Sequence, residues 1–117
     1  VSVLLEDMQG SILPIAVAHG EGRLVATEQQ IAALNAENQV ILRYVDSLGN
    51  PTQHYPLNPN GSPEAITGQT SKDGRATVMM PHPERNFRAL QHSWKPEDWA
   101  EDGAWLRMFR NARKFIG

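Results

Sequence analysis

A histidine and a glutamate, two residues apart and each preceded by a proline, are the residues best suited to chemistry in this sequence. His82 and Glu84 lie in the stretch MMPHPERNF, directly after an apolar run. In an extended segment, residues two apart point to the same side, so the carboxylate can hydrogen-bond one imidazole nitrogen and leave the other free. The prolines restrict the backbone and lower the entropy cost of holding the ring in place. The pair therefore resembles the base and the orienting acid of a nucleophile-base-acid triad, and the alternative is a rigid turn at the end of a strand.

The nucleophile of such a triad is missing from these residues. The sequence contains no cysteine, which excludes a cysteine nucleophile, a disulfide and a thiolate metal site within it. Hydroxyl groups are available, but none lies in a G-x-S-x-G elbow, so a self-contained serine hydrolase is not expected. The serines considered are Ser11, Ser62, Ser71 and Ser93.

Two glycine-containing stretches could approach a ligand closely. In AHGEGR, glycines flank Glu21 just after an apolar run, which suits either a ligand contact with the backbone or a simple bend of the strand. The stretch NPNGSP is a loop, with a turn as its first interpretation and a functional loop as its second. The four histidines match no standard zinc spacing, so we expect no metal site.

Composition limits the class of protein. The 117 residues fit one domain, and 40% hydrophobic with 21% charged residues are typical of a folded chain. A net charge of -2 provides no general attraction to nucleic acid or to anionic membranes. No apolar run approaches the roughly 20 residues of a membrane span, and no signal peptide is visible, so we expect a cytoplasmic protein. Because the sequence starts inside an apolar run without a methionine, we expect residues 1–117 to be a fragment forming a single, incomplete domain.

Periodicity and turn residues predict the elements that position the pair. Residues 12–18 form a near-continuous apolar run and predict a buried strand. A short helix is expected from Thr27, with Gln30 completing a capping box and with Ile31 and Leu34 on one face. Two hairpins follow. The first joins VILRYVD to TQHYP, and the second joins EAITGQTS to RATVMM through Asp73 and Gly74, which suit positive backbone angles.

The last third of the sequence predicts an amphipathic helix. Its apolar residues are spaced as one helical face, which we expect to pack on the sheet: Trp105, Met108, Phe109, Ala112, Phe115 and Ile116. Acidic residues precede the helix and basic residues follow in its body and end, which matches the helix dipole. A solvated face explains the basic residues Arg107, Arg110, Arg113 and Lys114, with a phosphate site as the alternative.

Four stretches, in this order, closely resemble the carboxy-terminal end of the phosphoribosylformylglycinamidine synthase family. They cover nearly the whole chain: LPIAVAHGEGR, LRYVDSLGNPTQHYPLNPNGSP, TSKDGRATVMMPHPER and SWKPEDWAEDGAWLRMFRNARKFIG. The family carries out an ATP-dependent step of purine biosynthesis, converting formylglycinamide ribonucleotide to its amidine with ammonia from glutamine. The long tail from Ser93 is closer to the single-chain form of the enzyme than to the small separate glutaminase subunit.

The resemblance implies a fold and a site. The fold class is α/β, as the C-terminal portion of a flavodoxin-like class I glutamine amidotransferase sandwich, with a mixed, largely antiparallel sheet, two hairpins and a C-terminal helix. His82 and Glu84 match the catalytic histidine and glutamate, whereas the cysteine would lie upstream, so the isolated piece is expected to be inert. His19, Gly20 and Glu21 match a segment that resembles part of the glutamine pocket. ATP and Mg²⁺ would serve the upstream synthetase part, and this fragment is expected to hold no cofactor.

The expected partners are glutamine and the upstream remainder of the same enzyme, with no nucleic acid and no membrane. A fragment that exposes a buried strand is also expected to self-associate through its sheet. The rival hypothesis is a noncatalytic binding or assembly module in which PHPER is only a rigid turn.

Overall fold

The computed structural model describes residues 2–15, 23–59, 61–85, 88 and 102–117. These residues form two compact units. The first contains Ser2 and the described residues between 23 and 80, and the second contains the described residues between 3 and 15 and from 81 onward. No helix among the described residues is long and apolar enough to cross a membrane.

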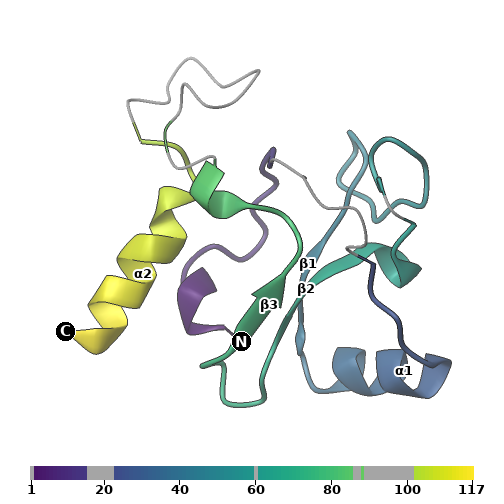
Figure 1. Cartoon of the computed structure of the whole chain (residues 1–117), viewed down its shortest axis with the longest axis horizontal. Coiled ribbons are helices and arrows are strands. Elements are labelled where there is room, and N and C mark those ends of the chain that lie inside the picture. The colour runs from purple at the N-terminus through teal and green to yellow at the C-terminus, as the bar shows by residue number, and fades with distance from the viewer. Residues whose placement is uncertain (1, 16–22, 60, 86–87, 89–101) are drawn as a thin grey trace. The chain divides into compact units, whose positions relative to one another are not determined.

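The first unit is built on a three-stranded antiparallel sheet (Figure 1). Its strands are β1 (Val40–Arg43), β2 (Ile66–Thr70) and β3 (Thr77–Met79), in the order β1-β2-β3. The central strand β2 is the most buried of the three, because it has a neighbour on each side. The expected α/β fold with an antiparallel sheet and a C-terminal helix is confirmed, and both strand pairs of the described sheet are antiparallel.

The second predicted hairpin is confirmed. β2 and β3 pair with Thr70 opposite Thr77, and a tight turn joins them. Gly74 adopts a φ of 74°, as expected for its turn position. Asp73 does not share the predicted positive φ. Its carboxylate instead accepts hydrogen bonds from the Ser71 hydroxyl at 2.6 Å and the Arg75 amide at 3.1 Å, and these hold its pKa below the ordinary value.

The first predicted hairpin forms only next to its turn. The Asp46 amide donates to the Asn50 carbonyl at 2.8 Å, Val45 bridges to Pro51, and the Thr52 amide donates to the Tyr44 carbonyl at 3.2 Å, but residues 53–59, which follow Thr52, form no second strand. Proline has no backbone N–H, so Pro51 cannot extend the ladder. β1 pairs instead with β2, a strand more than twenty residues further along the chain.

Helix α1 (Glu28–Ala36) begins where the capping residues predict. The Thr27 hydroxyl accepts the Gln30 amide, and the Gln30 side chain accepts the Thr27 amide, so the capping box is complete. Ile31 on this helix is buried in the first unit.

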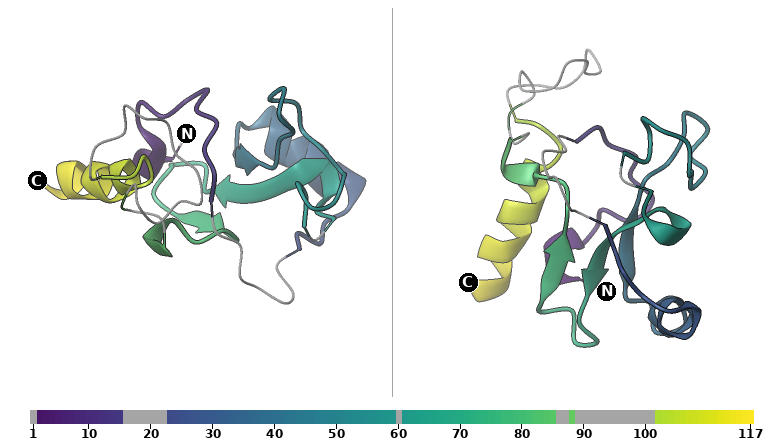
Figure 2. Two further views of the ribbon diagram at one scale, coloured as in Figure 1. Left: turned by 90° about the horizontal axis from the view of Figure 1, so that it is seen from above. Right: turned by 45° about the vertical axis from the view of Figure 1, so that its right-hand side comes forward.

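The second unit joins helix α2 (Leu106–Ile116) to the short 3-10 helix η1 (Val3–Leu5), and the two lie side by side in the further views of Figure 2. Two side chains hold the C-terminal segment against the N-terminal one through three hydrogen bonds. The Trp105 indole donates to the Pro14 carbonyl at 2.7 Å, and the Asn111 amide donates to the Leu4 and Glu6 carbonyls at 2.8 and 2.9 Å.

The predicted apolar face of α2 is therefore wrong in part. Trp105 and Met108 are buried, but Phe109, Phe115 and Ile116 are 45%, 54% and 75% exposed, and polar Asn111 is buried in their place. The reason is that α2 meets backbone carbonyls, and buried carbonyls need hydrogen-bond donors. Packing of α2 on the sheet stays a prediction, because the sheet belongs to the other unit.

The prediction of a buried strand over residues 12–18 is also wrong for the described residues 12–15. Residues 12–15 form no strand, and Ile12 is 64% exposed. Pro14 has no N–H for a ladder, and its carbonyl is taken by Trp105. Residues 16–18 lie outside the described residues. Residues 12–15, the described part of the strand that was expected to drive self-association, do not form a strand.

Candidate functional site

The segment that carries the histidine starts at the end of β3. The Met80 amide donates to the Thr67 carbonyl at 3.1 Å, which closes the ladder between β2 and β3. Immediately afterwards the 3-10 helix η3 (Pro83–Arg85) begins, and its last amide donates to the His82 carbonyl at 3.1 Å. Proline suits the first position of such a turn, because its missing N–H would have no partner there.

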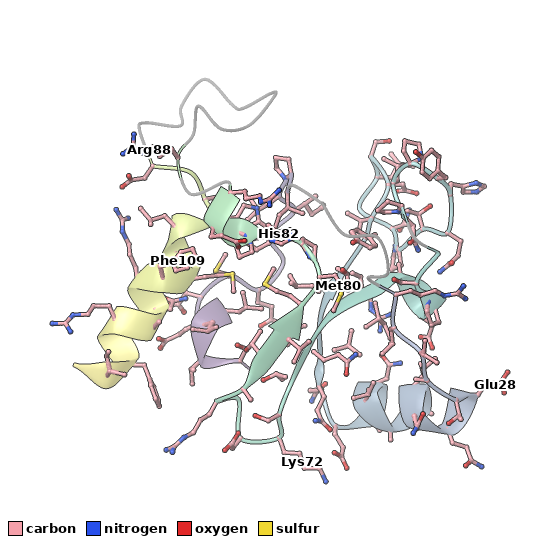
Figure 3. The ribbon with its side chains drawn as sticks, in the orientation of Figure 1. Glu28, Lys72, Met80, His82, Arg88 and Phe109 are labelled. Atoms are coloured by element: carbon pink, nitrogen blue, oxygen red, sulfur yellow. The ribbon has the colours of Figure 1, made fainter. Side chains whose placement is uncertain are left out.

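The predicted pair exists, although the backbone between its members is not extended. The His82 Nδ1 and the Glu84 Oε1 are 2.7 Å apart (Figure 3 shows His82 on the segment that follows Met80). The 3-10 turn brings the Glu84 carboxylate back to the His82 ring. In an extended segment, the alternation of side chains between the two faces would have placed both on the same side. The prediction that the two side chains meet is confirmed by this contact, and the prediction of an extended link between them is wrong.

The contact defines the state of both groups. A carboxylate is an acceptor, so Nδ1 carries the proton and donates to Glu84, while Nε2 keeps its lone pair. The hydrogen bond from His82 is the main cause that lowers the pKa of Glu84, followed by its own backbone amide. Glu84 is therefore ionised at neutral pH and orients the His82 ring through Nδ1. With Nδ1 bound to the carboxylate, Nε2 is the ring nitrogen that can exchange a proton with a reactant.

The histidine is accessible enough to act on a reactant. Its side chain is 29% exposed and that of Glu84 is 57% exposed. Pro81 and Pro83 on either side of it are both buried, so the backbone is anchored while the ring reaches the surface. A base needs this combination of a fixed backbone and a reachable nitrogen.

The predicted substrate residues His19, Gly20 and Glu21 lie outside the described residues. Within the described part of the chain, no group of three or more His, Asp or Glu side chains could hold a metal ion. The basic residues of α2 favour the solvated face over a phosphate site, because three of them already contact carboxylates. These pairs are Arg107 with Asp7, Arg110 with Asp102, and Lys114 with Glu6.

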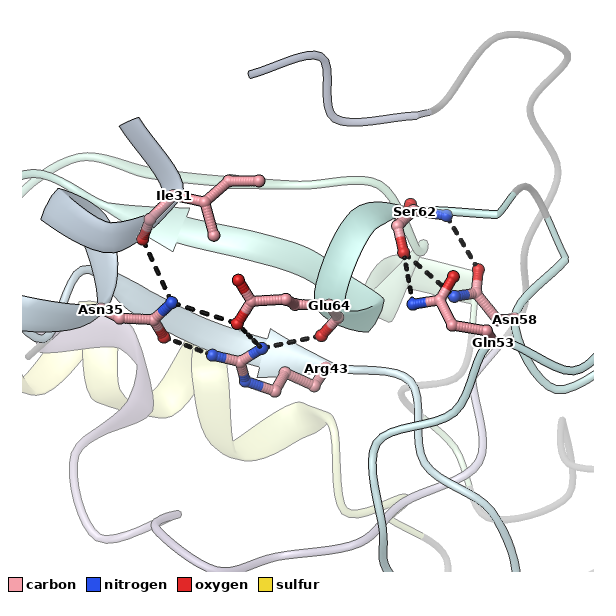
Figure 4. Close-up of polar contacts among 7 residues, drawn as sticks. All are labelled: Ile31, Asn35, Arg43, Gln53, Asn58, Ser62 and Glu64. Carbon is pink, nitrogen blue, oxygen red and sulfur yellow. Dashed lines mark hydrogen bonds and ion pairs between the residues drawn. The ribbon is translucent and has the colours of Figure 1, made fainter. Parts of the chain in front are cut away.

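A buried asparagine side chain forms hydrogen bonds at the loop NPNGSP, and the sequence did not predict them. Asn58 is 2% exposed, and its side-chain amide donates to the Thr52 and Ser62 carbonyls while its oxygen accepts the Ser62 amide at 3.1 Å. Gln53 adds a further hydrogen bond to the Ser62 carbonyl at 3.0 Å (Figure 4). Buried polar contacts therefore hold Asn58 and Ser62 of this loop together. An asparagine directly before a proline was the available signal in the sequence, but turn propensity explained it equally well.

A comparison with protein families identifies the class of this domain. Residues 1–116 match the family described as the CobB/CobQ-like glutamine amidotransferase domain. The chain belongs to that family. Glutamine is therefore the substrate of the domain, and the class of reaction is release of the glutamine side-chain nitrogen.

Proposed function

We propose that this chain is part of the glutaminase domain of phosphoribosylformylglycinamidine synthase, with His82 as the base and Glu84 as the group that orients it. The observation that carries the catalytic assignment is the 2.7 Å contact between Nδ1 and Oε1, which leaves Nε2 free. Membership of the glutamine amidotransferase family supplies the substrate for such a base. The particular enzyme rests on the resemblance of the four stretches named above.

In the proposed mechanism, Nε2 of His82 removes the proton from a cysteine thiol. The thiolate attacks the carbon of the glutamine side-chain amide, and the C–N bond breaks as the imidazolium returns its proton to the leaving nitrogen, which departs as ammonia. Water, deprotonated by His82, then cleaves the thioester to give glutamate and the free thiol. None of the 117 residues is a cysteine, so the thiol would come from a segment outside them.

The proposed enzyme would use this ammonia in an ATP-dependent conversion of formylglycinamide ribonucleotide to its amidine, in the cytoplasm. ATP and Mg²⁺ would bind to the synthetase part, outside the residues described here. The upstream remainder of the enzyme would thus be the main protein partner of this domain. His19, Gly20 and Glu21 remain the proposed contacts with glutamine.

The test separates glutamine use from synthesis. In the complete enzyme, His82→Ala should abolish glutamine-dependent synthesis and leave synthesis from added ammonium salts largely intact, because the base serves only ammonia release. The matched control is His54→Ala, since His54 is an exposed histidine remote in sequence from the pair. Equal loss of both activities in a folded variant would place His82 in the synthetase reaction and contradict the proposal.

The 117-residue chain by itself should release no ammonia from glutamine, because it lacks the thiol. Coupled assay of ammonia release measures this. Turnover above a buffer blank that disappears on replacing one serine or threonine would reveal another nucleophile. Such turnover would also remove the need for a cysteine outside the chain.

A further inference from the structure

The same pattern of four residues forms two 3-10 turns in this chain. Residues 62–65, Ser-Pro-Glu-Ala, contain η2 (Pro63–Ala65), and residues 82–85, His-Pro-Glu-Arg, contain η3. In each turn the carbonyl of the first residue accepts the amide of the fourth, at 3.0 Å in η2 and 3.1 Å in η3. Proline is the second residue of both turns, where its fixed φ favours this geometry. Differences between the two glutamates therefore come from their partners and not from the proline.

The two glutamates have different backbones and different partners. Glu64 has a φ of 50°, and its carboxylate accepts the Asn35 amide at 3.3 Å and lies 3.7 Å from the Arg43 guanidinium (Figure 4). Glu84 has no positive φ, and its carboxylate turns back to the His82 ring at 2.7 Å. A proline at the second position suits both states, because both common turn types favour it there. Proline therefore fixes the first step of the turn, and the partner that the carboxylate meets decides its direction.

The contact between His82 and Glu84 depends on a prearranged backbone, because both groups meet water. The Glu84 side chain is 57% exposed and the His82 side chain is 29% exposed. A contact between exposed groups is weak, since its electrostatic gain is offset by the entropy lost in holding two side chains in one geometry. Pro83 is buried, and its fixed φ favours the turn by about two- to fivefold over a residue with a free φ. For so weak a contact, a shift of this size decides how often the base is oriented.

We propose that Pro83 is a positioning residue for the His82 base. It holds the 3-10 turn in which the Glu84 carboxylate reaches Nδ1, and so raises the fraction of molecules whose Nε2 is oriented for proton transfer. Pro83 touches neither substrate nor the reacting atoms in this account. The inference rests on the proposed role of His82 in glutamine hydrolysis.

The first experiment is the series Pro83→Ala and Pro83→Gly in the complete enzyme, in which the backbone gains freedom at each step. Glutaminase kcat should fall in the same order, by about twofold in Pro83→Ala and by about three- to tenfold in Pro83→Gly. The KM for glutamine should change by less than about threefold, because the oriented base acts after binding. Synthesis from ammonium salts should be unchanged, since that reaction does not use the base.

A second measurement follows the contact itself. The pKa of Glu84 should rise toward its ordinary value in the same order, because the hydrogen bond from His82 is the largest cause of its lowering. Carbon NMR of labelled glutamate measures this pKa. In a Glu84→Ala background the contact is absent, so Pro83→Gly should change glutaminase kcat by less than about 1.5-fold. A proline that only stabilised the fold would produce the same loss in both backgrounds.

The matched control is the same pair of substitutions at Pro63, which holds the same position in η2. Pro63→Ala and Pro63→Gly should change neither activity. Equal glutaminase kcat with proline, alanine and glycine at position 83, an equal loss in the Glu84→Ala background, or an unchanged pKa of Glu84 would each overturn the inference. If Pro83→Gly does not fold, Pro83→Ala decides it by the same double-mutant comparison.

His82→Ala is measured in parallel to separate the two proposals. Normal glutaminase activity in that variant would refute the proposed function itself. Loss of activity there, with normal activity in the Pro83 series, would refute only the positioning role.

Discussion

Gly68 lies at the centre of β2, where adding a single methyl group should be costly. A Cβ at this position would lie 2.8 Å from the Leu42 Cδ1, 2.9 Å from its Cβ and 3.0 Å from its Cγ. Carbon atoms in van der Waals contact prefer about 3.5 to 4.0 Å, so the new atom would be roughly 0.5 to 1 Å too close. Leu42 Cδ1 can rotate away, but its Cβ moves only with the backbone of β1. The Gly68→Ala substitution therefore forces β1 and β2 apart at the point where they pair.

Two opposing effects set the magnitude. Alanine in place of a strand glycine lowers the entropy of the unfolded chain and would stabilise by about 0.4 to 1 kcal/mol where the native backbone fits. Overpacking a close contact costs about 1 to 3 kcal/mol. Gly68 has no positive φ to add strain, so the contact with Leu42 decides the sign. We expect a net loss in the free energy of unfolding of about 1 to 2 kcal/mol, measured by urea denaturation.

Two further variants check the cause. Leu42→Ala removes two of the three short contacts, so Gly68→Ala should be less destabilising in that background, and the double-mutant cycle should show a coupling of at least about 0.5 kcal/mol. Gly61→Ala is the matched glycine, because a Cβ there meets nothing within 4 Å and its cost comes from a φ of 67° alone. That cost should not depend on Leu42. Unchanged or increased stability of Gly68→Ala at equal m-value would refute the packing argument.

Three other predictions concern single groups. The carboxyl of Glu84 should titrate below 4.5 by carbon NMR and return toward that ordinary value in His82→Ala, because the histidine hydrogen bond is the largest cause of the lowered pKa. Since the pKa of Glu84 is depressed in the folded state, the stabilising contact with His82 is fully present above pH 4.5 and is lost as the pH falls through the folded-state pKa. A Glu84 titration that His82→Ala leaves unchanged would contradict this. Asn58→Ala should lower the free energy of unfolding by about 1 to 3 kcal/mol, because it leaves buried backbone groups without partners; a neutral effect in urea denaturation would show that water replaces the amide. Thr67→Val should be neutral or stabilising, because the buried Thr67 hydroxyl has no hydrogen-bond partner among the described residues; a loss above about 1 kcal/mol would reveal a partner.

The features that the sequence predicted well are those whose partners lie within a few residues. The Thr27 capping box closes over three residues, and the hairpin at Gly74 depends on one turn. His82 and Glu84 are two residues apart, so any backbone that brings the second back toward the first produces their contact. For this reason the pair was predicted correctly even though the link between its members is a 3-10 turn and not an extended strand.

The features that were missed depend on distant partners. The burial of Asn111 follows from carbonyls 107 and 105 residues away, and no helical periodicity contains that information. The contacts of Arg43 reach eight residues back to Asn35 and 21 residues forward to Glu64. The sequence by itself determined the turn at Gly74, the Thr27 cap and the contact between His82 and Glu84, because short-range sterics and hydrogen bonds specify them. Only the tertiary structure decided which polar side chains are buried and which apolar ones remain exposed, because that choice depends on the backbone groups each side chain meets after the chain has folded.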